Sequence, residues 1–224
     1  MPSFPSRVEN LGDEVPFTVW NGFALEGLPN RDSTKFKGQY GIDQCETLLR
    51  GTFRYAGYCS LVCDIQALKL IDESPSAILT ECDTWSQFLK RLTDFPGGDM
   101  EAFRAHLGKI KNGRGENVKV EELEKLGILS ETAIENKASP LDALAALLNG
   151  RMQYGKGERD AILMRHEVTT HQHPHITHGV DFVYYGNQGS EDGKEYTAMA
   201  QTVGYPAAIA AHLVLQDIAH LIGQ

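Results

Sequence analysis

The alternation of apolar and polar positions predicts strands at the start of the chain. From 15 to 27, the segment "VPFTVWNGFALEG" alternates apolar with polar or small residues, which is typical of a strand with one buried face. A second strand is predicted over 47–55, where "TLLRGTFRY" alternates apolar residues with Arg50, Thr52 and Arg54. One face of this second strand therefore carries two guanidinium groups and a hydroxyl.

Helical periodicity replaces this alternation from Tyr58 to about Tyr154. Several amphipathic segments follow one another here, separated by Gly, Pro or Asp/Ser signals. The last of them has clear start chemistry, with Ser139 as N-cap, Pro140 at the first helical position and Asp142 in the first turn. The polar stretch "KIKNGRGENVKV" between two of these helices is interpreted as an exposed loop, with Arg114 as a surface residue.

Two strands are predicted after the helices, over 159–168 and 177–186, and a helix rich in small residues follows, broken at Pro206. This order of elements predicts an α+β fold, with one mainly antiparallel mixed sheet and a helical insertion lobe. The expected division assigns 1–57 and 155–224 to one α/β domain and 58–154 to the lobe.

Composition and charge narrow the classes of partner. With 42% hydrophobic and 23% charged residues the chain is an ordinary globular mixture, and its net charge of -9 argues against nucleic acid or an anionic membrane surface. No apolar run reaches the 18 or so residues of a membrane span. The four cysteines form no CxxC pair, so they are interpreted as reduced thiols of an intracellular protein, Cys59 and Cys63 as core residues.

The sequence gives little support for a dinucleotide site or a metal site. "NGRGEN" and "YGKGER" lack the GxGxxG spacing and do not link a strand to a helix, so no dinucleotide site is expected in this chain. The densest titratable cluster comprises His166, His171, His173, His175 and His178. It could be a metal site or a solvated turn, and the turn is favoured, because no Asp, Glu or Cys joins the tip and the spacing fixes no ligand geometry.

The segment "LPNRDSTKF" at 28–36 is the strongest candidate for chemistry. It places Arg31 in a loop dense in hydrogen-bonding groups, next to the strand face that carries Arg50, Thr52 and Arg54. A guanidinium fork matches a carboxylate bidentately, so these groups could form an anion receptor on stiff elements. Interdomain or surface salt bridges are an equally good interpretation of this pattern.

At these residues the sequence resembles a known family. "FALEGLPNRDSTKF", "LLRGTFRYAGY" and "YTAMAQTVGYPAAIAAHLVL" are similar to segments of the L-glutamate-forming saccharopine dehydrogenases, including the matching half of the bifunctional aminoadipic semialdehyde synthases. The resemblance runs from about Phe17 to the C-terminus. It implies the substrate-binding and dimerisation domain, with its helical lobe, of an enzyme whose Rossmann domain binds NAD or NADP and is absent from this chain.

The resemblance also implies a substrate site and a reaction. Saccharopine would contact Arg31, Thr52, Phe53 and Arg54, with Phe53 in place of a more usual Leu and acting through its backbone. NAD(P)+ would oxidise saccharopine to an imine, which water splits into L-glutamate and 2-aminoadipate 6-semialdehyde. No general acid or base is assigned, since those residues belong to the missing part.

The resemblance further implies a homodimer in the cytoplasm, or in mitochondria if the chain belongs to a bifunctional lysine-degrading enzyme. The chain alone is expected to bind no cofactor and no metal. The alternative is a stand-alone carboxylate-binding or dimerisation module without catalytic activity.

Overall fold

The structure, a computed structural model, describes residues 15–17, 20, 22–30, 32–171, 176–187 and 196–216. It divides into two compact units, Met1–Arg151 and Met152–Gln224. The first unit contains β1 (Val15–Phe17), β2 (Leu25–Pro29), the short 3-10 helix η2 (Thr34–Phe36), β3 (Gly51–Tyr55), α1 (Tyr58–Ala67), α2 (Ala77–Thr80), α3 (Trp85–Leu92), α4 (Met100–Leu107), α5 (Val120–Lys125) and α6 (Pro140–Arg151). The second contains β4 (Ala161–Thr169), β5 (Thr177–Tyr185) and α7 (Ala198–Leu215). The predicted α+β class is confirmed.

The described strands form two separate antiparallel sheets, in the orders β1-β2-β3 and β4-β5, and not the single sheet predicted. The segment at 15–27, predicted as one strand, holds β1 and the start of β2. A turn separates them, closed by the amide of Phe23 donating to the carbonyl of Trp20 at 2.9 Å. The sequence between these two residues reads Asn-Gly, a strong hairpin signal that the alternating pattern obscured. Within each sheet, strands that are consecutive in sequence therefore pair with each other, and the longest connection, from β2 to β3, contains η2.

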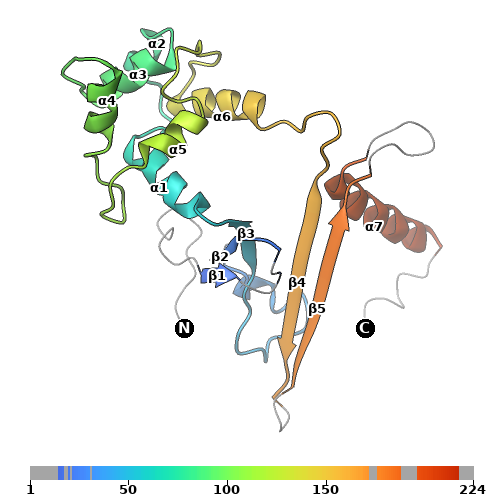
Figure 1. Ribbon diagram of the computed structural model, residues 1–224. Helices are drawn as coiled ribbons and strands as arrows, with labels where there is room; N and C mark the ends of the chain where they lie inside the picture. The colour runs from blue at the N-terminus through green and yellow to red at the C-terminus, as the bar shows by residue number, and fades with distance from the viewer. Residues whose placement is uncertain are drawn as a thin grey trace. The chain divides into compact units, whose positions relative to one another are not determined.

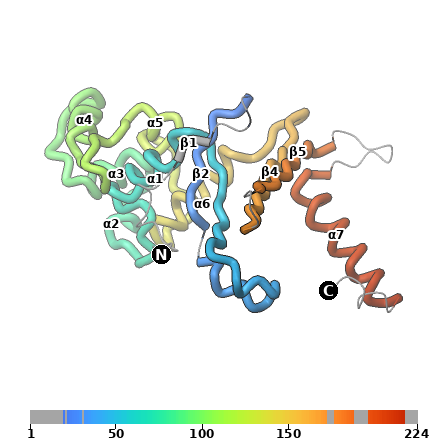
Figure 2. The backbone as a smooth tube through the Cα atoms, turned by 90° about the horizontal axis from the view of Figure 1, so that it is seen from below, coloured from blue at the N-terminus to red at the C-terminus, as the bar shows by residue number. Residues whose placement is uncertain are grey.

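Helices α1 to α6 lie together in Figure 2, and the buried side chains between them form one apolar core. Its fully buried side chains include Leu68, Leu70, Leu79, Trp85, Phe88, Leu89, Phe103, Leu107, Leu123 and Ile128. Several helices begin at a side-chain cap, as Asp99 accepts from the amide of Ala102 and Ser139 from that of Asp142. The predicted start of α6 is thus confirmed. The caps satisfy amides that would otherwise lack partners at each helix start.

Most residues of the stretch at 109–120 are exposed, as predicted, but the stretch is anchored to the lobe at the buried residues Asn112 and Val118. Asp64, fully buried in α1, accepts hydrogen bonds from the side-chain amide of Asn112 at 2.7 Å and from the backbone amide of Lys119 at 3.0 Å. The side-chain Oδ1 of Asn112 in turn accepts from the backbone amides of Arg114 and Glu116. A buried carboxylate needs hydrogen-bond donors, and the loop supplies them to Asp64. These bonds hold the loop against α1.

In the second unit, α7 lies beside the two-stranded ribbon of β4 and β5 (Figure 1). The buried carboxylate of Asp160, just before β4, accepts from the amides of Ala198 and Met199 at 2.5 and 2.9 Å. The hydroxyl of Tyr184 on β5 donates to the side-chain carbonyl of Gln201 at 2.6 Å. These bonds fix the start of α7 against the ribbon, because an acceptor at a helix N-terminus satisfies unpaired amides and complements the helix dipole.

α7 continues through Pro206, so the predicted break there is wrong. Proline removes one hydrogen bond, but the surrounding alanines favour the helix strongly and most of α7 is exposed, so water can solvate the freed carbonyl. By length and composition alone, α7 could also cross a membrane, although Gln201, Thr202 and His212 interrupt its apolar residues. A single helix of this kind supports such a role only weakly, and the predicted absence of a membrane partner stays a prediction.

Candidate functional site

Strand β3 carries three of the four predicted site residues. In the register of β2 with β3, Thr52 lies opposite Leu28 and Arg54 opposite Glu26. Side chains of directly opposed residues share a face and successive residues alternate, so Thr52 and Arg54 share a face and Phe53 is on the other. The structure therefore brings the hydroxyl and one guanidinium together, as predicted from the alternating pattern.

Arg54 presents its guanidinium at the surface. Its Nη1 donates to the carbonyl of Phe53 at 2.7 Å, and the guanidinium carbon lies 5.3 Å from the centre of the Tyr58 ring, at the first position of α1. Within the part of the chain that the structure describes, Arg54 has no carboxylate partner. The group is thus held by a carbonyl and an aromatic face while most of its donors remain available to an anion.

Phe53 packs on the opposite side of the sheet from Arg54. Its ring centre is 5.5 Å from that of Trp20, with the two planes nearly perpendicular. Such an edge-to-face pair anchors the strand through apolar contact. The position predicted to carry Leu in relatives is therefore a packing position here, and the proposed backbone contact with substrate stays a prediction.

The loop after β2 carries the remaining site residue, Arg31, which lies outside the described residues. Its neighbour Asn30 donates its amide to the carbonyl of Arg50 at 2.8 Å, which continues the β2–β3 pairing to the edge of the loop. Asp32 accepts from the amide and the hydroxyl of Thr34, at 2.9 and 2.6 Å, and these bonds lower the pKa of Asp32. The Asp32 carboxylate therefore holds the loop in a turn just before η2.

Glu26 is a site residue that the sequence did not reveal. It is 8% exposed, and its two carboxylate oxygens accept from the backbone amides of Gly57 at 3.1 Å and Cys59 at 2.7 Å, at the start of α1. Burial raises the pKa of Glu26, but these bonds and the nearby Arg114 outweigh burial, so the pKa lies below its ordinary value. The sequence signal that could have identified Glu26 is its position as the one charged residue of β2, among apolar residues and a glycine.

Arg114 is not the surface residue that the sequence suggested. It is half-buried on the loop tied to Asp64, and its charge acts on the Glu26 carboxylate. Replacing Arg114 would therefore perturb the site region. A control variant must come from elsewhere in the chain.

The histidine cluster is only partly described, since His173 and His175 lie outside the described residues. His166 on β4 and His178 on β5 are exposed. Across the described residues, no group of three or more His, Cys, Asp or Glu side chains is arranged to hold a metal ion. The preference for a solvated turn over a metal site stays a prediction.

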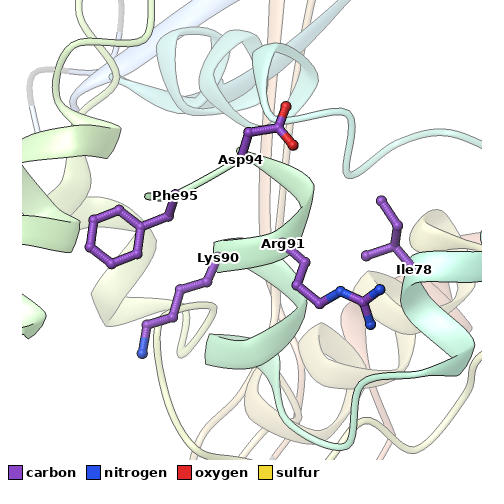
Figure 3. Close-up of a pocket in the computed structure, with 5 residues that line it drawn as sticks. All are labelled: Ile78, Lys90, Arg91, Asp94 and Phe95. Atoms are coloured by element: carbon purple, nitrogen blue, oxygen red, sulfur yellow. The ribbon is translucent and has the colours of Figure 1, made fainter. Parts of the chain in front are cut away.

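A shallow pocket of about 400 Å³ lies in the helical lobe, lined by Ile78, Lys90, Arg91, Asp94 and Phe95. Figure 3 shows its three charged side chains pointing in different directions. Lys90 lies over the ring of Phe103, and Arg91 is paired with Glu81 at 2.6 Å. A binding site needs convergent polar groups, so this pocket does not compete with the β3 face as a candidate.

The two glycine-rich segments do not form a phosphate cradle. In "NGRGEN", the amide of Gly115 donates to the carbonyl of Asn112, and the bonds within the segment close a tight turn. In "YGKGER", the amide of Glu158 donates to the carbonyl of Gly155, which forms a turn before β4. Neither segment leads from a strand into a helix, which is the arrangement of a dinucleotide-binding loop, and the predicted absence of a dinucleotide site in this chain stays a prediction.

Comparison with known proteins agrees with the motifs. The family model described as the saccharopine dehydrogenase C-terminal domain matches residues 4–223. The chain is 35% identical over 218 residues to the mitochondrial alpha-aminoadipic semialdehyde synthase of Bos taurus, covering 93% of this chain and 22% of that protein. It is 31% identical over 215 residues to the saccharopine dehydrogenase (NADP(+), L-glutamate-forming) of Saccharomyces cerevisiae, covering 94% of this chain and 47% of that protein.

Among solved structures, the chain is similar to the apo histidine-tagged saccharopine dehydrogenase (L-Glu forming) from Saccharomyces cerevisiae. The TM-score is 0.79 at 29% sequence identity, over 92% of this chain and 46% of that one. The chain thus spans about a fifth of the bovine synthase and just under half of the yeast enzyme. At this coverage the fold likeness includes residues of both units.

Proposed function

Because the chain belongs to the saccharopine dehydrogenase C-terminal domain family, we propose that it is the substrate-binding part of an oxidoreductase of lysine metabolism. In the proposed reaction, saccharopine, NAD(P)+ and water yield L-glutamate, 2-aminoadipate 6-semialdehyde, NAD(P)H and a proton. The observation that carries the proposal is the family match over nearly the whole chain, together with a β3 face that presents a hydroxyl and an available guanidinium.

The proposed role of this chain is to bind and orient the substrate. Saccharopine carries three carboxylates around a secondary amine, so a receptor needs several directed cationic donors. We assign Arg31 and Arg54 as bidentate donors and Thr52 as a hydroxyl donor, with the backbone of Phe53 completing the contact. Orientation of this kind lowers the barrier by fixing the reacting carbon before hydride leaves it, and the nicotinamide supplies the redox chemistry.

The proposal is tested in an enzyme that joins this chain to the remaining half of a saccharopine dehydrogenase. Saccharopine-dependent formation of reduced nicotinamide, together with saccharopine binding by calorimetry, is the expected result. Binding without turnover would instead favour the stand-alone carboxylate-binding or dimerisation module. Absence of binding would contradict the proposal.

The chain alone is expected to bind neither NAD nor NADP, because neither glycine-rich segment presents a row of amides at a helix start. The measurement is calorimetric titration of the 224-residue chain with each nucleotide, with the joined enzyme as positive control. Micromolar binding by the chain alone would place a cofactor site within these residues and contradict this assignment.

We further propose that the chain pairs with a second copy through the apolar face of α7. Its large exposed apolar residues include Met199, Val203, Tyr205, Ile209 and Val214, and β5 adds Val180 and Phe182. Patches of this size on a soluble chain mark protein interfaces, and most homo-oligomers pair identical surfaces. A dimer would bury the face that gives α7 its apolar character.

The expected result is a dimer by light scattering, and a monomer when Ile209 is replaced by aspartate, because a charge at the centre of an apolar interface stays unpaired. Tyr40→Asp is the control, since Tyr40 is also a large exposed apolar residue, 70% exposed against 59% for Ile209, but lies in the first unit. A monomeric wild-type chain at high concentration, or a dimer that Ile209→Asp leaves intact, would contradict the assignment.

The proposed domain division keeps 1–57 and 155–224 as the substrate-binding and dimerisation domain, with 58–154 as the inserted lobe. The proposed compartment is the cytoplasm, or the mitochondrion if the chain is part of a bifunctional enzyme such as the bovine relative.

A further inference from the structure

Glu26 and Arg54 lie directly opposite each other in the β2–β3 register but are not paired. Opposed side chains on neighbouring strands have Cβ atoms about 4.5–5.5 Å apart, so an ion pair would be the default for a carboxylate and a guanidinium. Both oxygens of Glu26 instead accept from the amides of Gly57 and Cys59. The carboxylate is thus directed at the start of α1 and away from the candidate receptor.

The start of α1 needs this acceptor. Its N-cap is Gly57, which has φ of 98° and no side chain to cap the first amides. That backbone conformation suits glycine and is strained in other residues, so a capping Ser or Asp is disfavoured at this position. Glu26 supplies the missing acceptors from the neighbouring strand, and its charge also complements the positive end of the helix dipole.

The first residue of α1 in turn supports the receptor. Tyr58 places its ring 5.3 Å from the guanidinium carbon of Arg54, while the carbonyl of Phe53 accepts from Nη1. A shift of the helix start would therefore move the aromatic face on which Arg54 rests. The chain of contacts runs from Glu26 to the amides of Gly57 and Cys59 at the start of α1, and from Tyr58 at that start to Arg54.

We propose that Glu26 is a positioning residue of the carboxylate receptor, which caps α1 from β2 and so keeps the guanidinium of Arg54 oriented and unpaired for substrate. The substrate in this statement rests on the proposed function, whereas the capping and the orientation of Arg54 do not. The low pKa of Glu26 agrees with a carboxylate that remains charged throughout the physiological range.

The test compares Glu26→Ala and Glu26→Gln in the full chain with Asp99→Ala, which removes a carboxylate cap from α4 far along the sequence. Glu26→Ala is expected to weaken saccharopine binding roughly tenfold, to speed hydrogen exchange at the Gly57 and Cys59 amides and to shift the Arg54 side-chain 15N resonance. Glu26→Gln keeps one acceptor oxygen and is expected to restore part of each change. Asp99→Ala is expected to destabilise the lobe but to leave binding and the Arg54 resonance unchanged.

An acid titration adds a readout of the charge. Because the folded-state pKa of Glu26 is depressed, its contribution to stability is complete above the ordinary glutamate pKa and is lost as pH falls through the lower folded-state value. Glu26→Gln is expected to remove this part of the acid sensitivity.

The proposal is overturned if folded Glu26→Ala, or folded Glu26→Gln should the alanine variant not fold, keeps the wild-type Arg54 resonance and amide exchange. If wild-type chain and joined enzyme fail to bind saccharopine while these two signals still change, the proposed function fails and the positioning role stands.

Discussion

Arg54→Lys is expected to weaken saccharopine binding roughly ten- to a hundredfold, since a charge-assisted bidentate contact contributes about 1.5–3 kcal/mol. Lysine keeps the positive charge but loses the planar fork and the stacking on Tyr58. An effect nearly as large as that of alanine is therefore expected. Calorimetric titration with saccharopine and kinetics of the joined enzyme provide the measurement.

The same substitution at other arginines defines the control. Arg31→Lys is expected to behave like Arg54→Lys, and Thr52→Val to lose less. Arg91→Lys is the matched control, because Arg91 is a surface residue of α3 paired with Glu81. If both receptor variants bind saccharopine as tightly as the Arg91→Lys protein, the loop and strand form a salt-bridge element, and the receptor assignment is wrong.

Gly186→Ala is expected to destabilise the second unit by about 2–4 kcal/mol, through steric overlap and loss of a helix cap. A Cβ at position 186 would lie 2.4 Å from Oδ1 of Asp160 and 3.0 Å from the backbone nitrogen of Ala198. Asp160 cannot move aside without losing its bonds to the amides that start α7. The measurement is urea unfolding combined with hydrogen exchange over 198–216.

Gly150→Ala provides the matched control for this substitution. Gly150 is in α6, and no atom lies within 4 Å of the position its Cβ would take. Alanine favours a helix over glycine by up to about 1 kcal/mol, so a neutral or stabilising effect is expected. If Gly186→Ala lowers the free energy of unfolding no more than Gly150→Ala does, the close packing of Gly186 against Asp160 and Ala198 is not needed to hold α7.

Local signals made much of the fold predictable. Ser139, Pro140 and Asp142 mark the start of α6 by chemistry confined to four consecutive residues, and the structure confirms it. The strands β4 and β5 begin and end within two residues of the predicted bounds. Periodicity and caps are properties of the chain itself, which is why no tertiary information was needed for them.

The errors arise where tertiary contacts override local pattern. The anchoring of the loop with two glycines was missed because nothing nearby in sequence shows that Asp64, 48 residues before Asn112, needs the side-chain amide of Asn112. Pro206 looked like a helix break because local chemistry does not reveal that the freed carbonyl can face water. The single predicted strand at the start of the chain failed because alternation continued across a turn.

The candidate site was also predictable only where local pattern determines it. Alternation alone placed Thr52 and Arg54 on one face, but only the family resemblance selected a carboxylate receptor over surface salt bridges. The role of Glu26 depends on α1, which begins more than thirty residues later, and on the register of β2 with β3. A buried carboxylate in a strand signals that partners exist without identifying them.

The bond between Asp64 and the loop at 112–119 also constrains how the lobe folds. The carboxylate of Asp64 in α1 has to be buried in the folded lobe, but its hydrogen-bond donors lie some fifty residues later in the chain. Because burial without these donors is unfavourable, the helix and the loop gain their stability in the same step. α2, α3 and α4 lie between the two partners in sequence, and closing this bond encloses them. Chain synthesis must therefore pass Lys119 before α1 can reach its final stability.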